Sequence, residues 1–243
     1  ILGVNSYNLV MHGNLIDKYI LRYKLFTKYS NKTPQIIVWD LCNGAFGYSE
    51  RYFDYQFAPY LFDKDIFHFL NNRRHKFTLL DRFMPLLRYY NHKEILGYAI
   101  KNERFWIGSH KGFQGKDWNW NPERLNNLEN KSIPMSFNPE LFPDFLSTLN
   151  AMKDAGSKVI LVYSPFHYKG QQKQHGMDSL FCIYKKIAED NDCLFLNYNY
   201  DSICLDTSFF VDATHLNLKG ANCFSAKCAK DIKIALKLSR PIQ

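Results

Sequence analysis

The sequence predicts an α/β fold in which a parallel β-sheet lies between two layers of helices. Continuous apolar runs at 36–39 and 158–163 are typical of strands that are covered on both faces. Between and after these runs, apolar residues recur at helical spacing, as they do from 14 to about 28 and from about 178 to 190. Strands that alternate with helices indicate a three-layer α/β/α arrangement with a parallel sheet.

The first elements follow in order from the amino terminus. Residues 1–4 are interpreted as the end of a short buried strand, and a helix is expected from Asn14 to about residue 28. The strand at 36–39 leads into a turn at 40–44, at the strand end where open α/β sheets bind ligands. Because the chain begins inside an apolar segment and only four strands are counted, we expect further residues upstream.

Residues from about 45 to 137 form an insertion within a single domain that covers 1–243. The insertion is rich in aromatic residues, and short helical patches occur at 66–70 and at 79–87. A loop punctuated by glycine follows at 108–121 and carries Trp118 and Trp120. These two indoles are suited to stacking on sugar rings, and anchoring of the loop on the core is the equally weighted alternative.

Regular alternation resumes after the insertion. A helix opens at Asn138–Pro139 and ends at Gly156, and the strand at 158–163 follows it. Then come a helix at 178–190, a strand at 193–196 and a last helix from 218 to about 238, which Asn217 caps.

The charge of the chain permits an acidic partner. The formal net charge is +8 and the isoelectric point is about 9.1, which suits a nucleic acid, an anionic glycan or a membrane surface. The densest basic cluster, 72–76, is short and is interpreted as a solvated face. No basic-aromatic motif accompanies it, so nucleic-acid binding ranks last among the function classes.

Cysteine and hydropathy patterns exclude further classes. The chain has six cysteines and no C-x-x-C pair, so a zinc site is not expected. Disulfides and buried free thiols both remain open. An apolar run of about 18 residues is absent, so no membrane span is expected within the chain, and no signal peptide is expected in it either.

The stretch from Phe209 to Asn217 places an acid and a histidine three positions apart on a turn before the last helix. His215 is well placed there to act as a general base, with the carboxylate of Asp212 beside it. The alternative is a surface turn with a structural histidine.

Three short blocks resemble the sequence blocks of SGNH/GDSL hydrolases. The segment Asp212-Ala213-Thr214-His215 resembles the family's last block, which supplies the triad acid and base. The segment 41–44 resembles the block whose asparagine, here Asn43, donates to the oxyanion, although the leading Gly and the Asp of that block are replaced. The segment 2–6 resembles the block whose glycine, here Gly3, completes the oxyanion hole. The fold is then expected to be SGNH/flavodoxin-like.

The nucleophile block of this family has no clear counterpart. By register, Ser6 falls where the oxyanion glycine of the second block belongs. Ser6 is therefore interpreted as an oxyanion-loop residue, and the true nucleophile is expected upstream of Ile1 or lost. Ser6 as the nucleophile is the alternative, and Ser109 is a weaker candidate inside the insertion.

The resemblance implies a serine esterase or O-acyltransferase that acts on acyl esters of a carbohydrate, without a cofactor or metal. It also implies a place in the bacterial cell envelope or periplasm, and His167 is expected to line the crevice or to be a structural histidine. A missing nucleophile would instead imply a non-catalytic, SGNH-like glycan-binding module.

Overall fold

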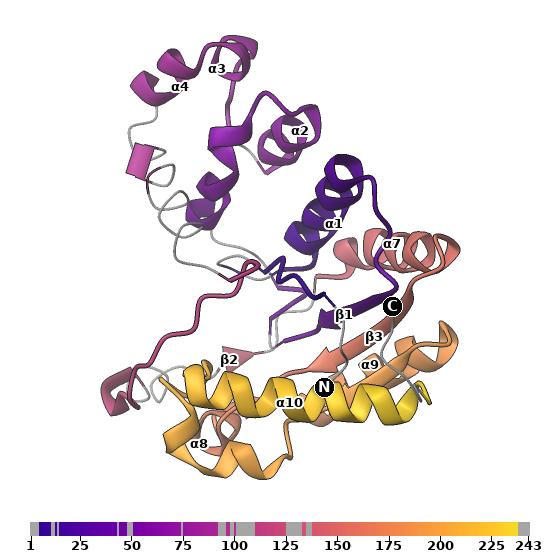
Figure 1. Cartoon of the computed structure of the whole chain (residues 1–243). Coiled ribbons are helices and arrows are strands. Elements are labelled where there is room, and N and C mark those ends of the chain that lie inside the picture. Colours follow the sequence, from indigo (N-terminus) through magenta and orange to yellow (C-terminus); the bar gives the residue numbers. More distant parts are fainter. Residues whose placement is uncertain are drawn as a thin grey trace.

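The computed structural model describes residues 5–10, 13, 15–42, 44–47, 51–73, 75–91, 96–97, 100, 110–124, 133–134 and 138–237 (Figure 1). The helices are α1 (Ile16–Ser30), α2 (Lys64–Asn72), α3 (Leu79–Phe83), α4 (Pro85–Asn91), α7 (Phe142–Asp154), α8 (Tyr168–Gln171), α9 (Met177–Asp190) and α10 (Leu218–Ala235). The strands are β1 (Ile36–Asp40), β2 (Ile133–Pro134), β3 (Lys158–Tyr163), β4 (Gln174–His175) and β5 (Leu194–Asn197). Short 3-10 helices are η1 (Arg51–Tyr60), η2 (Pro139–Leu141), η3 (Ser202–Leu205) and η4 (Thr207–Phe209).

The main sheet has three parallel strands in the order β1-β3-β5. The register pairs Trp39 with Leu161 and Leu161 with Phe195. This arrangement confirms the expected α/β class with a parallel sheet. The strand expected at residues 1–4 lies outside the described residues.

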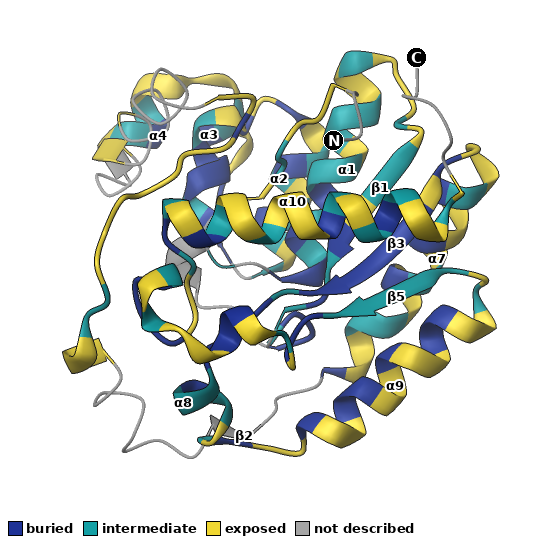
Figure 2. Ribbon diagram, turned by 60° about the horizontal axis from the view of Figure 1, so that its bottom comes forward, coloured by how far each residue is buried: buried dark blue, intermediate teal, exposed yellow. Residues whose placement is uncertain are grey.

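Helices pack against both faces of this sheet. Val159, Leu161 and Tyr163 of β3 point into a core shared with α1, α7 and α9. The alternate residues, Ile160 and Val162, belong to a second core shared with α10. Figure 2 shows α10 lying alongside the strands of this sheet. The period of two in side-chain direction therefore explains why the whole of 159–163 is apolar.

Strand β1 differs from the prediction that it is covered on both faces. Trp39 is buried, but Val38 points to the face of α10 and is 49% exposed. Within the described part of the chain β1 is an edge strand of the sheet, since it pairs only with β3. Helix α10 shares its core with Ile160 and Val162 of the neighbouring strand, and Val38 is not part of that core.

Where the insertion is described, it contains η1, α2, α3 and α4 and the loop at 110–124, and it has a core of its own. That core joins η1 and α2 to the face of α1 that points away from the sheet, through Leu21, Phe57 and Leu70. The expectation of a solvated basic face at 72–76 is wrong at two positions. Arg73 donates to Asp54 at 2.6 Å and pairs with Asp17, and His75 is buried beside Asp54.

Burial explains this ion network. The side chains of Lys18 and Asp54 are 4% and 0% exposed and lie 3.1 Å apart. A buried charge needs a partner of opposite sign, so each cation here meets an aspartate. The network connects α1 to the insertion, which sequence spacing did not indicate.

The six cysteines are free thiols, and Cys204 and Cys228 are buried. The disulfide alternative is therefore not realised. Among the described residues, no helix combines the length and the apolar character needed to span a membrane.

Candidate functional site

The turn that carries Asp212 and His215 is built by backbone pairing at its base. The Val211 N–H donates to His215 O at 2.8 Å, and the Asn217 N–H donates to Phe209 O at 2.9 Å. Helix α10 then starts tightly against the turn. A Cβ on Gly220 would lie 2.0 Å from Phe209 O, so only glycine fits there. The Oδ1 of Asn217 caps the helix by accepting from the Gly220 N–H at 2.9 Å, as predicted.

The loop after β3 fixes this turn at the carboxyl edge of the sheet. Strand β3 ends at Tyr163, and the backbone N–H of His167, four positions later, donates to Ala213 O at 3.0 Å. Ala213 is fully buried beneath the turn. The sequence-predicted acid and base therefore lie at the sheet edge where ligands bind in open α/β folds.

Asp212 and His215 are in direct contact. Nδ1 of His215 lies 2.8 Å from Oδ1 of Asp212, and the backbone N–H groups of Thr214 and His215 donate to the same oxygen at 2.9 and 3.0 Å. The Thr214 hydroxyl also donates to Oδ1 of Asp212 at 2.9 Å and lies 2.7 Å from Nδ1 of His215. The carboxylate is thereby held in one orientation.

The second oxygen of Asp212 receives a cation. Nη1 of Arg124 donates to Oδ2 at 3.0 Å. Burial alone would raise the pKa of Asp212, but the hydrogen bonds from His215, Thr214 and Arg124 outweigh it and hold that pKa far below its usual range. Asp212 is therefore ionised at any physiological pH.

Exposure divides the pair into a buried acid and an open base. The side chain of Asp212 is 8% exposed, whereas that of His215 is 73% exposed. With Nδ1 committed to the carboxylate, Nε2 is the nitrogen left for a reacting group. This division suits an acid that orients and a base that exchanges protons.

The loop 110–124 lies against the turn and places the two tryptophans differently. The Leu218 N–H donates to Lys116 O at 2.9 Å, and the Asn121 N–H donates to Val211 O at 2.8 Å. The Trp120 ring packs on the buried His167 ring with centroids 4.5 Å apart. Trp120 therefore anchors the loop.

Trp118 has a different environment. It is 49% exposed. Nζ of Lys116 lies 4.4 Å from its ring centroid and the guanidinium carbon of Arg124 lies 6.0 Å from it. Trp118 is thus an open aromatic face beside two cations, and Arg124 links it to Asp212.

His167 contacts the turn but does not face solvent. It is 0% exposed, and its Nδ1 accepts from the Lys169 N–H at 3.3 Å as the cap of α8. Its Nε2 is buried without a hydrogen-bond partner. Burial lowers the pKa of His167, and the nearby Lys169 lowers it further. The neutral His167 ring therefore serves as a packing surface for the Trp120 ring.

The remaining predicted site residues are not joined to this pair. Ser6 is exposed, in a segment where the Asn8 N–H donates to Lys111 O at 2.9 Å. In the described part of the chain no hydrogen bond links Ser6 to His215. Gly3, Asn43 and Ser109 lie outside the described residues. Their roles remain predictions.

Sequence reasoning missed Arg124 and Thr214. Thr214 stands inside the motif, and its hydroxyl was a usable signal. Arg124 is 88 positions from Asp212 and has no local pattern that marks it.

The described residues contain no group of three or more His, Cys, Asp or Glu side chains that could hold a metal ion.

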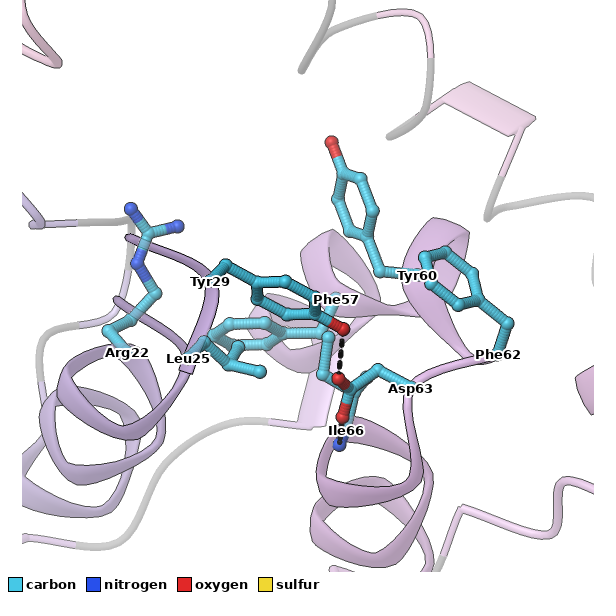
Figure 3. A pocket seen from close by; sticks show the side chains of 8 residues that line it. All are labelled: Arg22, Leu25, Tyr29, Phe57, Tyr60, Phe62, Asp63 and Ile66. Carbon is cyan, nitrogen blue, oxygen red and sulfur yellow. Dashed lines mark hydrogen bonds between the residues drawn. The ribbon is translucent and has the colours of Figure 1, made fainter. Parts of the chain in front are cut away.

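A pocket of about 180 Å³ lies between α1, η1 and α2 (Figure 3). Its lining is mostly apolar and includes Phe57, Phe62 and Ile66. Its carboxylate, Asp63, is bonded to Lys28 at 2.7 Å and to the Tyr29 hydroxyl. This pocket could therefore enclose a small ligand, but its lining contains no acid–base pair.

Comparison of the chain with protein-family models, with curated proteins and with solved structures finds no match.

Proposed function

We propose that this protein is an SGNH-type serine esterase or O-acyltransferase that acts on acyl esters of a carbohydrate. The observation that carries the proposal is the 2.8 Å contact between Asp212 Oδ1 and His215 Nδ1, on a turn at the carboxyl edge of a parallel sheet. The resemblance of 212–215 to the last SGNH block supports the same assignment. The three-layer SGNH-like fold and a place in the cell envelope belong to this proposal.

The proposed reaction uses the pair as base and orienting acid. Nε2 of His215 removes the proton from a serine hydroxyl as its oxygen attacks the ester carbonyl carbon. The carboxylate of Asp212 stabilises the imidazolium that forms. The same proton then passes to the leaving alcohol oxygen as the carbon–oxygen bond breaks. Attack on the acyl-enzyme by water completes hydrolysis, and attack by a sugar hydroxyl completes transfer.

The loop beside the pair supplies the sugar-binding part of the proposal. Trp118 is half exposed, and its ring is large enough to stack on a pyranose. Lys116 and Arg124 lie beside it and are suited to hydroxyl or carboxylate groups of a glycan. Because Arg124 also holds Asp212, a sugar bound at Trp118 would lie next to the catalytic turn.

A second candidate function is a non-catalytic glycan-binding module. The observation that favours it is the absence of a serine partner: in the described part of the chain, the only hydroxyl hydrogen-bonded to His215 is that of Thr214. A module of this kind would keep Trp118 as a platform and would have no turnover.

Turnover of p-nitrophenyl acetate and of an acetylated polysaccharide tests the enzyme proposal. His215→Ala should lower kcat/KM by a factor of roughly 10³ or more. His68→Ala, which removes an exposed histidine of α2, is the matched control and should change nothing. Equal activity in the wild type and in His215→Ala would exclude the assignment.

Covalent labelling identifies the nucleophile. A fluorophosphonate probe followed by peptide mapping should mark one serine, and Ser6→Ala should abolish the label if Ser6 is that residue. If no serine is labelled and no turnover is measured, glycan affinity decides for the binding module. Trp118→Ala should then weaken that affinity about tenfold, whereas Tyr200→Ala, at an exposed aromatic elsewhere, should not.

A further inference from the structure

The α3–α4 hairpin exposes large apolar side chains at the outer end of the insertion. We call these side chains the hairpin patch; they are Leu79, Leu80, Phe83, Met84, Leu86 and Tyr90, with exposures between 50% and 85%. Figure 1 places α3 and α4 at the end of the molecule that lies far from the sheet. Large apolar side chains that gather on the surface of a folded protein are typical of an interaction site.

Other residues hold the hairpin in place, so the exposure of the hairpin patch does not result from incomplete folding. The guanidinium of Arg88 is buried and donates to four backbone carbonyls, at 2.9 Å to Asp81, 3.1 Å to Ala58, 2.7 Å to Pro59 and 2.9 Å to Arg82. Thr78 and Asp81 form a capping box at the start of α3. Phe77 is buried in the core of the insertion.

The exposed charge within residues 76–91 is positive. Within 76–91 the acid is Asp81, which is 2% exposed and is used in the capping box. Lys76 is exposed, and Arg82 is half-buried with its guanidinium carbon 4.9 Å from the Phe83 ring centroid. The surface of the hairpin therefore combines apolar and cationic groups without an exposed anion.

Arg82 also extends the patch toward the pocket of Figure 3. Its Nε and Nη2 donate to Phe62 O at 3.2 and 3.1 Å. The Phe62 side chain is 58% exposed and lines the pocket. Phe62, in the loop before α2, thus lies next to Arg82 of α3.

We propose that the hairpin patch docks on the surface of an anionic lipid bilayer. Leucine, phenylalanine and methionine side chains would enter the boundary between headgroups and acyl chains, while Lys76 and Arg82 would lie at the level of the phosphates. Tyr90 has the apolar ring and polar tip that favour this boundary. The proposal rests on the insertion alone and is independent of the catalytic assignment.

Vesicle flotation with the full chain tests this docking. The protein should bind vesicles of phosphatidylcholine with 30 mol% phosphatidylglycerol (about one anionic lipid in three) and should bind pure phosphatidylcholine at least about tenfold less. The double variant Phe83→Ser/Leu86→Ser, at side chains 65% and 85% exposed, should lose binding at least about tenfold. The double variant Leu205→Ser/Ile234→Ser, at side chains 67% and 66% exposed in other elements, is the matched control and should bind as the wild type.

Circular dichroism of the three proteins should coincide, since each substitution removes an exposed side chain. Absence of binding to anionic vesicles, or equal binding by Phe83→Ser/Leu86→Ser and the wild type, would overturn the proposal. Self-association that this variant abolishes, without vesicle binding, would overturn it in favour of a second copy of the chain.

Discussion

The carboxyl group of Asp40 offers a test of how the sheet edge is built. Asp40 ends β1, and its Oδ1 accepts from the Ser164 N–H at 3.2 Å, in the loop after β3. Burial raises the pKa of Asp40 to about 6 from the ordinary 3.8, although the bonds from Ser164 act in the opposite direction. The ionised carboxylate of Asp40 therefore destabilises the folded state.

The size of this destabilisation follows from the difference between the pKa of Asp40 in the folded chain and its ordinary pKa. A shift of roughly two pKa units corresponds to about 3 kcal/mol. Below about pH 4 the group is protonated in the folded and the unfolded chain, so it has no effect. Between about pH 4 and 6 only the unfolded chain releases the proton, so the free energy of unfolding falls as the pH rises. Above about pH 6 the penalty is constant.

Asp40→Asn removes the charge and keeps the oxygen that accepts from Ser164. Urea unfolding should show a free energy of unfolding higher by up to about 3 kcal/mol at pH 8, and a difference near zero at pH 4. Asp154→Asn, at an exposed end of α7, is the control and should shift it by less than about 0.5 kcal/mol at both pH values. A stabilisation independent of pH, or a loss of stability at pH 8, would refute the argument.

Two other predictions concern stability. Hydrogen bonds from Lys28 and Tyr29 lower the pKa of Asp63 to about 2, against the effect of burial. Asp63→Asn should therefore lower the free energy of unfolding by roughly 2 kcal/mol at pH 7, and by progressively less as the pH falls from about 4 to 2. Unfolding measured at each pH tests this, and an equal loss at pH 2 would contradict it. Asn217→Ala should lower the free energy of unfolding by about 1–2 kcal/mol, because α10 loses its cap. Asn217→Asp keeps an acceptor for the Gly220 N–H and should lower it by less in the same denaturation assay. Equal losses for the two variants would show that the cap is unimportant.

Local sequence determined much of the regular structure. The strand expected at 158–163 is β3, and the helix expected at 178–190 is α9 with one more residue at its start. Both are read from side-chain periodicity, which depends only on neighbours in the chain. The cap at Asn217 and the contact between Asp212 and His215 were predictable for the same reason, since their partners lie three positions away.

Contacts between distant segments could not be predicted in this way. Trp118 and Trp120 stand in the same loop, and the sequence left both their roles open. The fold separates them, because the ring of Trp120 meets His167 from the loop after β3 while Trp118 stays half exposed. Nothing in the loop itself distinguishes the two indoles.

The sequence by itself therefore determined the longer strands and helices, such as β3 and α9, and where an acid and a base meet on one turn. Only the tertiary structure decided that Arg124 reaches Asp212, that Arg73 is paired with aspartates rather than solvated, and that Val38 is exposed on an edge strand. The physical reason is that periodicity and capping act over a few residues, whereas burial and ion pairing depend on which segments the folded chain brings together.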